Sequence, residues 1–420
     1  MKIAIIALGT QGDVQPYIAL GTGLLKAGHS VRLITHENFE QSVRAHKLEF
    51  YAMQGNVQEF MESQKIRELL EKGNFLAINT YAAKEAKRAA LLWAKDGLEA
   101  CRKVDLILAG VGGLNIAFAI AEKLDVPIVQ APVFPFTPTS EFPGVLFPQS
   151  IAKLGDIANR ISHSLIQQAM WQGFRAADTL ARKQVLELPA APFFGPYNSK
   201  RLNQHPTIYG FSQHVIPKPK DWNNARVTGY WFLETAPDWK PPTQLEEFLK
   251  NGTLPVYIGF GSMGSRNPKQ TSELVLEALK QTKQRAIIQS GWGGLSDENL
   301  PENVHTVDSV PHSWLFPRVA AVVHHGGAGT TAAGLRAGVP SIVIPFFGDQ
   351  AFWGNRVTAL GVGPRAIGRK QLTIENLAQA IEIAVTDSRM RQKARGLGAK
   401  IQAEDGIGNA VEAINEIMKN

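Results

Sequence analysis

The segment 324–340 reads HHGGAGTTAAGLRAGVP and joins a valine-rich strand pattern to an alanine-rich helix pattern. Glycines at such a junction let the backbone approach a ligand closely. Free amide groups at a helix N-terminus attract anions, and phosphate above all. His324 or His325 can add charge or a hydrogen bond, and the alternative is a close-packed glycine turn around one buried histidine. The pattern therefore predicts a seat for a charged group, with phosphate as the favoured occupant.

A second glycine-containing junction, GTQGDVQP at 9–16, follows the first strand pattern of the chain and contains Asp13. Aspartate is a common N-cap residue, because its side chain accepts hydrogen bonds from the first amide groups of a helix. The same carboxylate could act as a general base, and a helix N-terminus would keep it ionised for that task. This stretch alone favours the cap, so a catalytic role depends on the rest of the chain.

A carboxylate and an amide follow another strand pattern, in the stretch PFFGDQAFWGN at 345–355. Asp349 and Gln350 can accept from and donate to the vicinal hydroxyls of a sugar, and their position after HHGGAGTT gives them weight. The chain has no C-x-x-C, H-E-x-x-H or D-x-D pattern. The first two patterns hold zinc, and the third would supply the carboxylate pair for a metal-bound sugar nucleotide. We therefore expect no metal.

A G-x-G-x-x-G pattern occurs at Gly259, Gly261 and Gly264, directly after a strand pattern. A dinucleotide site of the dehydrogenase type needs an acidic residue at the end of the next strand. The next strand pattern, RAIIQS, ends without a carboxylate, and there is no G-x-x-x-x-G-K-[ST] pattern. We therefore interpret the glycines as a phosphate-facing turn with Ser262 as a ligand.

Short β-rich runs alternate with longer helical patterns, including one around 80–101, which is typical of a parallel α/β architecture. The strand patterns are KIAIIA, SVRLIT, EFYAM, DLILAG and PIVQA in the first half, and PVYIGF, RAIIQS, VHTVD, AAVVHH and SIVIPF in the second. Both halves open with a strand, a glycine turn, a polar residue and a helix. We expect two Rossmann-like domains with parallel sheets facing across a cleft, where ligands collect at the carboxyl ends of the strands.

Proline and tryptophan interrupt the periodic pattern between the halves, in WFLETAPDWKPPT at 231–243, and we interpret this stretch as an interdomain linker. The expected domains are then 1–230 and 244–400. Residues 401–420 are expected to form a C-terminal helix that can cross back to the first domain.

The bulk composition describes a globular chain of 420 residues with 44% hydrophobic residues, a net charge of +7 and one cysteine, Cys101. The N-terminal apolar run is too short for a secretory signal, and no run approaches the about 20 apolar residues of a membrane span. One cysteine fits a reducing compartment, so we expect a cytoplasmic protein. The basic surface can aid solubility or contact an anionic membrane. No run of basic and aromatic residues suggests nucleic-acid binding.

The segment FPFTPTSEFPGVLFP at 134–148 is rich in phenylalanine and proline and follows a strand pattern at its carboxyl end. Small hydrophobic ligands bind in apolar clefts with few polar groups. We therefore predict that Phe134, Phe136, Phe142 and Phe147 line an apolar acceptor pocket. The alternatives are contact with a bilayer and an ordinary packed loop.

Three stretches together resemble the family 1 glycosyltransferases, and among them the branch of sterol glucosyltransferases and antibiotic glycosyltransferases. They are GTQGDVQPYIALGTGLLKAGHSV at 9–31, GFGSMG at 259–264 and VDSVPHSWLFPRVAAVVHHGGAGTTAAGLRAGVPSIVIPFFGDQAFWGNRV at 307–357. The third is highly specific, whereas 55–230 is not diagnostic and is expected to set the acceptor. The resemblance implies the GT-B fold and a metal-independent, inverting transfer from a nucleotide sugar.

The resemblance also implies roles for individual residues. Asp13 matches the aspartate proposed as the base on the acceptor hydroxyl, and His325 matches the histidine that contacts the donor diphosphate. The chain departs from plant members of the family at Ser309, where they carry tryptophan, and at Ala333, where they carry glutamate. The residues expected on the donor side are Thr10, Ser262, Val310, His312, His325, Ala328, Gly329, Thr330, Asp349 and Gln350.

The resemblance therefore implies a glucosyltransferase that moves glucose from UDP-glucose to a hydroxyl of a sterol-like or other lipophilic acceptor. The UDP-sugar is a co-substrate, and no cofactor is expected. Two alternatives stay open. One is a transferase that uses a dTDP-sugar or UDP-GlcNAc on a natural-product or lipid acceptor, and the other is a lipid-binding protein without enzymatic activity.

Overall fold

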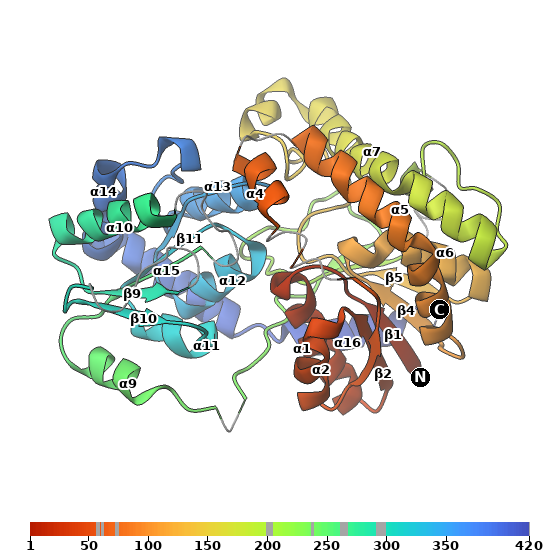
Figure 1. Cartoon of the computed structure of the whole chain (residues 1–420), viewed down its shortest axis with the longest axis horizontal. Coiled ribbons are helices and arrows are strands. Elements are labelled where there is room, and N and C mark those ends of the chain that lie inside the picture. Colours follow the sequence, from red (N-terminus) through yellow and green to blue (C-terminus); the bar gives the residue numbers. More distant parts are fainter. Residues whose placement is uncertain are drawn as a thin grey trace. The chain divides into compact units, whose positions relative to one another are not determined.

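The computed structural model describes residues 1–55, 59, 63–71, 75–198, 205–236, 239–260, 268–290 and 300–419. They form two compact units, each built on its own parallel sheet (Figure 1). The first unit contains residues 1–60, 74–233 and 404–420, and the second contains 61–73 and 234–403. The prediction of an α/β chain with two parallel sheets is confirmed.

The sheet of the first unit has the strand order β3-β2-β1-β4-β5-β6-β7. Its strands are β1 (Lys2–Ile6), β2 (Ser30–Thr35), β3 (Glu49–Ala52), β4 (Leu106–Ala109), β5 (Ile128–Gln130), β6 (Thr207–Tyr209) and β7 (Ala225–Val227). The first five coincide with the predicted strand patterns. The last two were not predicted, because three residues each are too few to show a period of two.

Alternation along β1 divides the core of the first unit between two helical layers. Ile3 and Ile5 pack with α1 and α16, whereas Ala4 and Ile6 pack on the opposite face with α6. The α-helices from this part of the sequence are α1 (Gln11–Lys26), α2 (Glu40–Ala45), α5 (Phe75–Ala100), α6 (Leu114–Leu124), α7 (Asp156–Ala181) and α16 (Gly406–Ile417). Shorter helical turns are η1 (Glu37–Phe39), η2 (Val111–Gly113), η3 (Gln149–Leu154), the π-helical η4 (Arg182–Leu186) and η5 (Pro196–Asn198).

The last helix, α16, belongs to the first unit and lies beside α1 (Figure 1). The two helices approach closely at Gly23, where a Cβ atom would lie 2.1 Å from Cγ2 of Ile407. Any larger residue at position 23 would force the Ile407 side chain to move.

The sheet of the second unit has the strand order β10-β9-β8-β11-β12. Its strands are β8 (Val256–Gly259), β9 (Ala286–Gln289), β10 (Val304–Val307), β11 (Ala321–His324) and β12 (Ser341–Val343). The helices are α4 (Gln64–Glu71), α9 (Thr243–Lys250), α10 (Pro268–Thr282), α11 (His312–Leu315), η7 (Phe316–Arg318), α12 (Ala328–Ala337), α13 (Gln350–Leu360), η8 (Arg369–Gln371), α14 (Ile374–Thr386) and α15 (Ser388–Gln402). Val256 and Ile258 pack with α10 and α14, and Tyr257 packs with α9 and α11 on the other face.

Each sheet reverses its strand order once, between β1 and β4 in the first unit and between β8 and β11 in the second. In open parallel sheets, ligands bind at the carboxyl ends of the strands that flank such a reversal. The junctions that follow β1 and β11 are therefore the places to look for a site. Within the described part of the chain, no helix is long and apolar enough to cross a membrane.

Candidate active site

The junction between β1 and α1 positions Asp13. Thr10 is the N-cap residue of α1, and Asp13 reaches back to it in the arrangement of a capping box. The backbone N–H and the hydroxyl group of Thr10 donate to Oδ2 of Asp13 at 2.9 and 3.0 Å. Gly9 has a φ of +150°, and a Cβ atom there would lie 2.4 Å from the same carboxylate oxygen. Glycine is therefore required before the helix, and the Thr10 hydroxyl is engaged with Asp13.

The environment of Asp13 corrects two expectations, namely that Asp13 is the N-cap residue and that the helix N-terminus controls its ionisation. Asp13 is the third residue of α1 and not its N-cap. Burial raises the pKa of its carboxyl group, and this effect outweighs the hydrogen bonds from Thr10, which lower the pKa. Among the described residues, Oδ1 of Asp13 has no hydrogen-bond partner, so one oxygen remains for a proton. A half-buried carboxylate with a raised pKa is a stronger base than an exposed one.

A small cavity adjoins Asp13 where the first sheet reverses its strand order. Tyr17, one helical turn after Asp13, donates its hydroxyl hydrogen to the carbonyl oxygen of Ala131 at 2.6 Å. A Cβ atom at Gly110 would lie 2.4 Å from the Tyr17 hydroxyl oxygen. The cavity is lined by Leu8, Asp13, Tyr17, Gly110, Val111, Gly112, Val133 and Phe134.

Tyr17 and the glycine turn 110–112 were not predicted from the sequence. Two signals could have found them. Tyr17 follows Asp13 at the i, i+4 spacing that places two side chains on one helix face. The sequence GVGG follows the strand pattern DLILA, just as the other glycine turns follow theirs.

The four phenylalanines predicted to line an acceptor pocket lie in different environments. Phe134 lines the cavity beside Asp13. Phe136 is 5% exposed and packs on the Phe134 ring with centroids 6.4 Å apart. Phe142 packs on the Trp222 ring at 6.5 Å, and Phe147 is half-buried. The buried ring of Phe136 does not reach the surface, whereas Phe142 and Phe147 are partly exposed.

The second junction, between β11 and α12, leaves its helix end open. The N-cap residue of α12 is Gly327, its first turn contains no acidic residue, and no side chain of the described residues caps the helix. The first amide groups of a helix have no partners within the helix. The predicted phosphate ligands Ala328, Gly329 and Thr330 form this first turn. The helix therefore presents a partial positive charge that no carboxylate in the described part of the chain caps.

Glycines shape this helix end as well. Gly326 has a φ of +90°, which strongly favours glycine. A Cβ atom at Gly327 would lie 2.5 Å from Nε2 of His325. The bare backbone of Gly327 therefore makes room for that nitrogen directly beside the start of α12.

Three histidines of the second unit, His312, His324 and His325, interact electrostatically. Burial lowers the pKa of His312 and of His325 to about 4, and lowers that of His324 as well. Nδ1 of His324 accepts the backbone N–H of Gly326 at 3.0 Å, so its proton resides on Nε2. The His312 ring stacks on Phe316 with centroids 4.3 Å apart. Without a bound anion all three are neutral at pH 7, so they offer hydrogen bonds and not charge.

Asp349 and Gln350 lie at the start of α13, and both already contact the protein. Oδ2 of Asp349 accepts the indole N–H of Trp353 at 2.7 Å. Oε1 of Gln350 accepts the backbone N–H groups of Phe346 and Phe347 at 2.7 and 3.1 Å. Gln350 therefore supports the loop before α13. Because its oxygen is already engaged, only its amide nitrogen could contact a sugar.

The remaining predicted residues divide into two groups. Val310 is half-buried and packs against the core of the second unit. Ser262, together with Gly261 and Gly264, lies outside the described residues.

Comparison with known proteins gives matches over both units. Residues 3–143 match the glycosyltransferase family 28 N-terminal domain, and residues 273–416 match the C-terminal domain of erythromycin biosynthesis protein CIII-like proteins. A sterol 3-beta-glucosyltransferase of Arabidopsis thaliana is 39% identical, over 99% of this chain and 68% of the relative. That of Komagataella phaffii is 36% identical, over 100% of this chain and 34% of the relative. The chain thus spans about two thirds of the plant relative and about one third of the fungal one.

Solved structures of antibiotic glycosyltransferases share the fold. The calicheamicin glycosyltransferase CalG4 matches with a TM-score of 0.67 and 18% identity, over 99% of this chain and 97% of that chain. The spinosyn forosaminyltransferase SpnP matches with a TM-score of 0.69 and 16% identity, over 100% of both chains. These similarities confirm the predicted GT-B fold.

Proposed function

This chain belongs to the glycosyltransferase family that includes the sterol 3-beta-glucosyltransferases, and on that premise we propose that it transfers glucose from UDP-glucose to a hydroxyl of a sterol-like acceptor. One observation carries the proposal. The chain combines a half-buried carboxylate beside a small cavity that Val133 and Phe134 line with a helix N-terminus that no described side chain caps and that lies beside neutral histidines. The first suits a lipophilic alcohol, and the second suits a diphosphate.

Asp13 acts as the general base in the proposed reaction. Oδ1 of Asp13 takes the proton of the acceptor hydroxyl, whose oxygen then attacks the anomeric carbon of glucose. The bond between that carbon and the β-phosphate oxygen breaks, and its electron pair leaves with UDP. A single displacement of this kind inverts the configuration at the anomeric carbon. Thr10 and Gly9 hold the base in position through the contacts around Oδ2.

The start of α12 stabilises the negative charge that develops on UDP. Preorganised amide dipoles in a water-poor site act strongly on such charge, and they need no reorganisation during the reaction. His325 adds a neutral ring nitrogen beside Gly327. We propose that these groups replace a metal ion in this role.

The remaining donor contacts are proposed on family grounds. Val310 and His312 hold the base of the nucleotide, Ser262 a phosphate, and Asp349 with the amide nitrogen of Gln350 the glucose hydroxyls. The residues 1–230 would bind the acceptor and 244–400 the nucleotide sugar, with 231–243 as the linker. The general base Asp13 belongs to the first unit and the proposed phosphate seat to the second.

The test is UDP release from UDP-glucose in the presence of EDTA, with and without a sterol in cyclodextrin. We expect little release without sterol and strong stimulation with it. UDP-GlcNAc and dTDP-glucose serve as competing donors, and equal or better use of either would replace the proposed donor. An absolute need for added metal would contradict the proposed role of α12. Sterol binding without any nucleotide-dependent stabilisation would indicate a lipid-binding protein instead.

A further inference from the structure

The first half of α7 has the reverse of the usual polarity, because its polar side chains face the protein. Asn159, Ser162, His163 and Gln167 are all buried. Each forms a hydrogen bond with the 134–148 segment: Asn159 Nδ2 with the Ser140 carbonyl at 2.8 Å, Ser162 Oγ with the Gly144 N–H at 2.8 Å, His163 Nε2 with the Phe142 carbonyl at 3.0 Å, and Gln167 Nε2 with the Phe136 carbonyl at 3.1 Å. The inner face of α7 therefore holds the segment that leads to Phe134 and the cavity beside Asp13.

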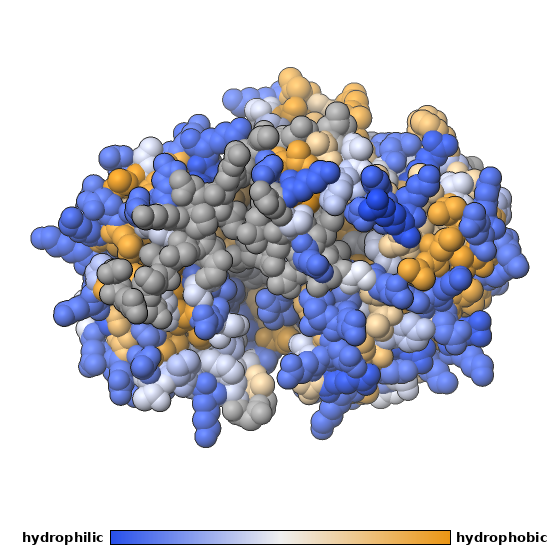
Figure 2. Space-filling view, viewed as in Figure 1, coloured by the Kyte–Doolittle hydropathy of each residue, from blue (hydrophilic) through white to orange (hydrophobic). Residues whose placement is uncertain are grey.

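The opposite face of the same helix exposes large apolar side chains. Ile157, Ile161 and Leu165 are 76%, 51% and 53% exposed, and Leu154 of η3 is 72% exposed just before them. The i, i+4 spacing of the three α7 residues places them in one row. Figure 2 shows the resulting hydrophobic surface at the top of the view, over the N-terminal part of α7. The hydrogen bonds on the inner face of α7 do not explain why its outer face exposes apolar side chains. Exposed apolar patches of this kind commonly mark an interaction surface.

The row continues into two exposed aromatic rings. Gln168 and Gln172 follow on the same helix face and donate to the carbonyl oxygens of Phe194 and Phe193 at 2.5 and 2.8 Å. Both rings are more than half exposed. The guanidinium of Arg175 lies 4.5 Å from the centroid of the Phe193 ring. Hydrogen bonds from α7 thus fix the backbone of residues 193–194, while the rings of Phe193 and Phe194 remain exposed to solvent.

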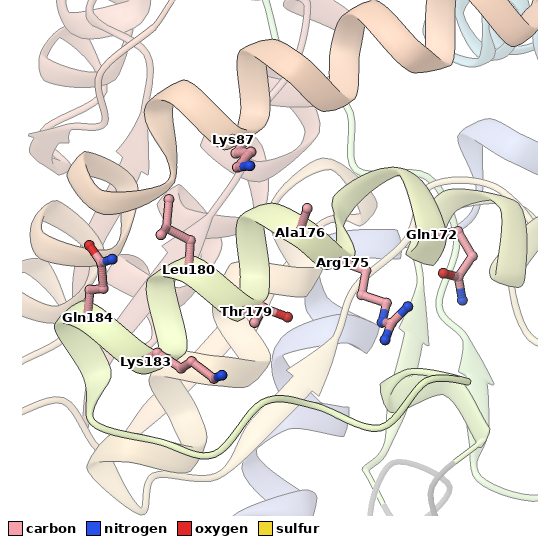
Figure 3. A pocket seen from close by; sticks show the side chains of 8 residues that line it. All are labelled: Lys87, Gln172, Arg175, Ala176, Thr179, Leu180, Lys183 and Gln184. Atoms are coloured by element: carbon pink, nitrogen blue, oxygen red, sulfur yellow. The ribbon is translucent and has the colours of Figure 1, made fainter.

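A basic groove lies at the far end of this face. Figure 3 shows Lys87 approaching from α5, and Arg175 on α7 with Lys183 in the turn after it. The other lining residues are neutral, so the groove contains three basic side chains and no acidic one. Such a groove attracts phosphate groups, and the apolar row beside it does not suit a free anion.

We propose that this α7 face docks on the surface of a lipid bilayer. We define it as the row Leu154, Ile157, Ile161, Leu165, Phe193 and Phe194, together with the basic groove. Apolar side chains flanked by basic ones are the pattern of helices that lie in the headgroup region. The apolar row enters the acyl boundary, and the groove contacts lipid phosphates. The inference rests on the proposed function, because a sterol-like acceptor resides in a bilayer, and α7 joins that surface to the acceptor segment.

The first test measures binding of the full chain to sedimentable vesicles of phosphatidylcholine with and without phosphatidylserine. The double variant Ile157→Gln/Ile161→Gln replaces two apolar side chains that are mostly exposed. Folding should therefore be unaffected, and a thermal melt would verify this. We expect at least about tenfold weaker partitioning, because two side chains that the bilayer would partly bury are lost. The control Leu254→Gln changes a leucine of the second unit that is 51% exposed, and it should bind as the native chain does. Equal binding of the double variant and the native chain would overturn the proposal, as would a native dimer that the double variant dissociates.

The second test separates the basic groove from the apolar row. Lys87→Gln/Lys183→Gln should weaken binding to vesicles with phosphatidylserine and flatten its salt dependence, while binding to pure phosphatidylcholine stays the same. An unchanged salt dependence would remove the groove from the docking surface.

Activity assays distinguish failure of the docking surface from failure of the proposed function. The Ile157→Gln/Ile161→Gln variant should glucosylate sterol in cyclodextrin at the native rate and sterol in vesicles several-fold more slowly. If both sterol preparations are used at the native rate, the docking surface has no role in acceptor delivery. If no chain uses sterol in either form but the variant loses vesicle binding, the surface stands and the proposed acceptor falls.

Discussion

The two glycine junctions, after β1 in the first unit and after β11 in the second, are built alike and used differently. Both pass from a parallel strand through a glycine turn into a helix N-terminus. In the first, the carboxylate of Asp13 reaches back to the N-cap residue Thr10. In the second, Gly327 is the N-cap residue, and none of the side chains that the structure describes caps the helix. The junction after β1 contains a carboxylate of the protein itself, whereas the junction after β11 can accept an anion from a ligand.

The burial of ionisable groups sharpens this difference. At the first junction burial raises the pKa of Asp13 and makes it a better proton acceptor. At the second, burial lowers the pKa of His312 and His325 to about 4, so these rings offer hydrogen bonds without charge. The same supersecondary unit can thus handle a proton or a phosphate, depending on which residue occupies the helix start.

The largest expected effect comes from removing the anion of the first junction. Asp13→Asn leaves a side chain of the same shape that cannot take a proton at neutral pH. We expect sterol-dependent UDP release to fall by about 10²- to 10⁴-fold. UDP binding, followed by calorimetry, should not change, because its proposed seat lies in the other unit. Retained activity would reduce Asp13 to a residue that only caps α1.

A converse change would close the second junction in the way that the first is closed. Gly327→Asp adds a carboxylate at the N-cap of α12, where the backbone is already extended. We expect UDP affinity to fall about tenfold or more, because the added charge competes with the diphosphate for the same amide groups. Gly327→Ala is the matched control, since it crowds Nε2 of His325 without adding charge. Equal losses in both variants would assign the effect to crowding.

The ionisable groups of the two junctions should contribute to the pH dependence of stability with opposite signs. His312 and His325 have folded pKa values of about 4, below the ordinary value of 6.5, so an unfolded chain binds protons first as the pH falls. Their contribution is present above pH 6.5 and is lost toward pH 4. Asp13 has a raised pKa, so its contribution to the first unit grows as the pH falls.

Hydrogen exchange at pH 7.5, 6 and 5 measures this contrast, because it reports strands β8–β12 and β1–β5 separately. The second unit should lose protection more steeply, and His312→Gln should flatten its dependence. Parallel losses in both units, unaffected by the substitution, would mean that the histidines are not the cause.

The smallest expected effect concerns the support of the first junction. Tyr17→Phe removes the hydrogen bond to the Ala131 carbonyl oxygen and leaves that oxygen without its partner. We expect the first unit to lose about 1 kcal/mol in its free energy of unfolding, measured in urea. UDP affinity should stay the same, and a change in it would show that the cavity beside Asp13 is coupled to the donor site.

The amino-acid sequence by itself determined the architecture and the position of the two junctions. Short apolar strands that alternate with helices indicate parallel sheets. This alternation is a local pattern, so it can be recognised in the sequence. The glycines at 9, 326 and 327 lie where a side chain would meet Asp13, Val343 or His325. Their positions in the sequence therefore marked the site before the fold was known.

Only the tertiary structure decided what these residues can do. Whether Asp13 is a stronger or weaker base depends on burial, and the cavity beside it is closed by Phe134 and the turn 110–112, about a hundred residues away in sequence. The neutrality of His325 likewise arises from its burial in the second unit. Phe136 was predicted from the sequence to line a pocket, and the fold buries its ring against Phe134. Burial sums contacts from distant segments, so no local pattern of residues can encode it.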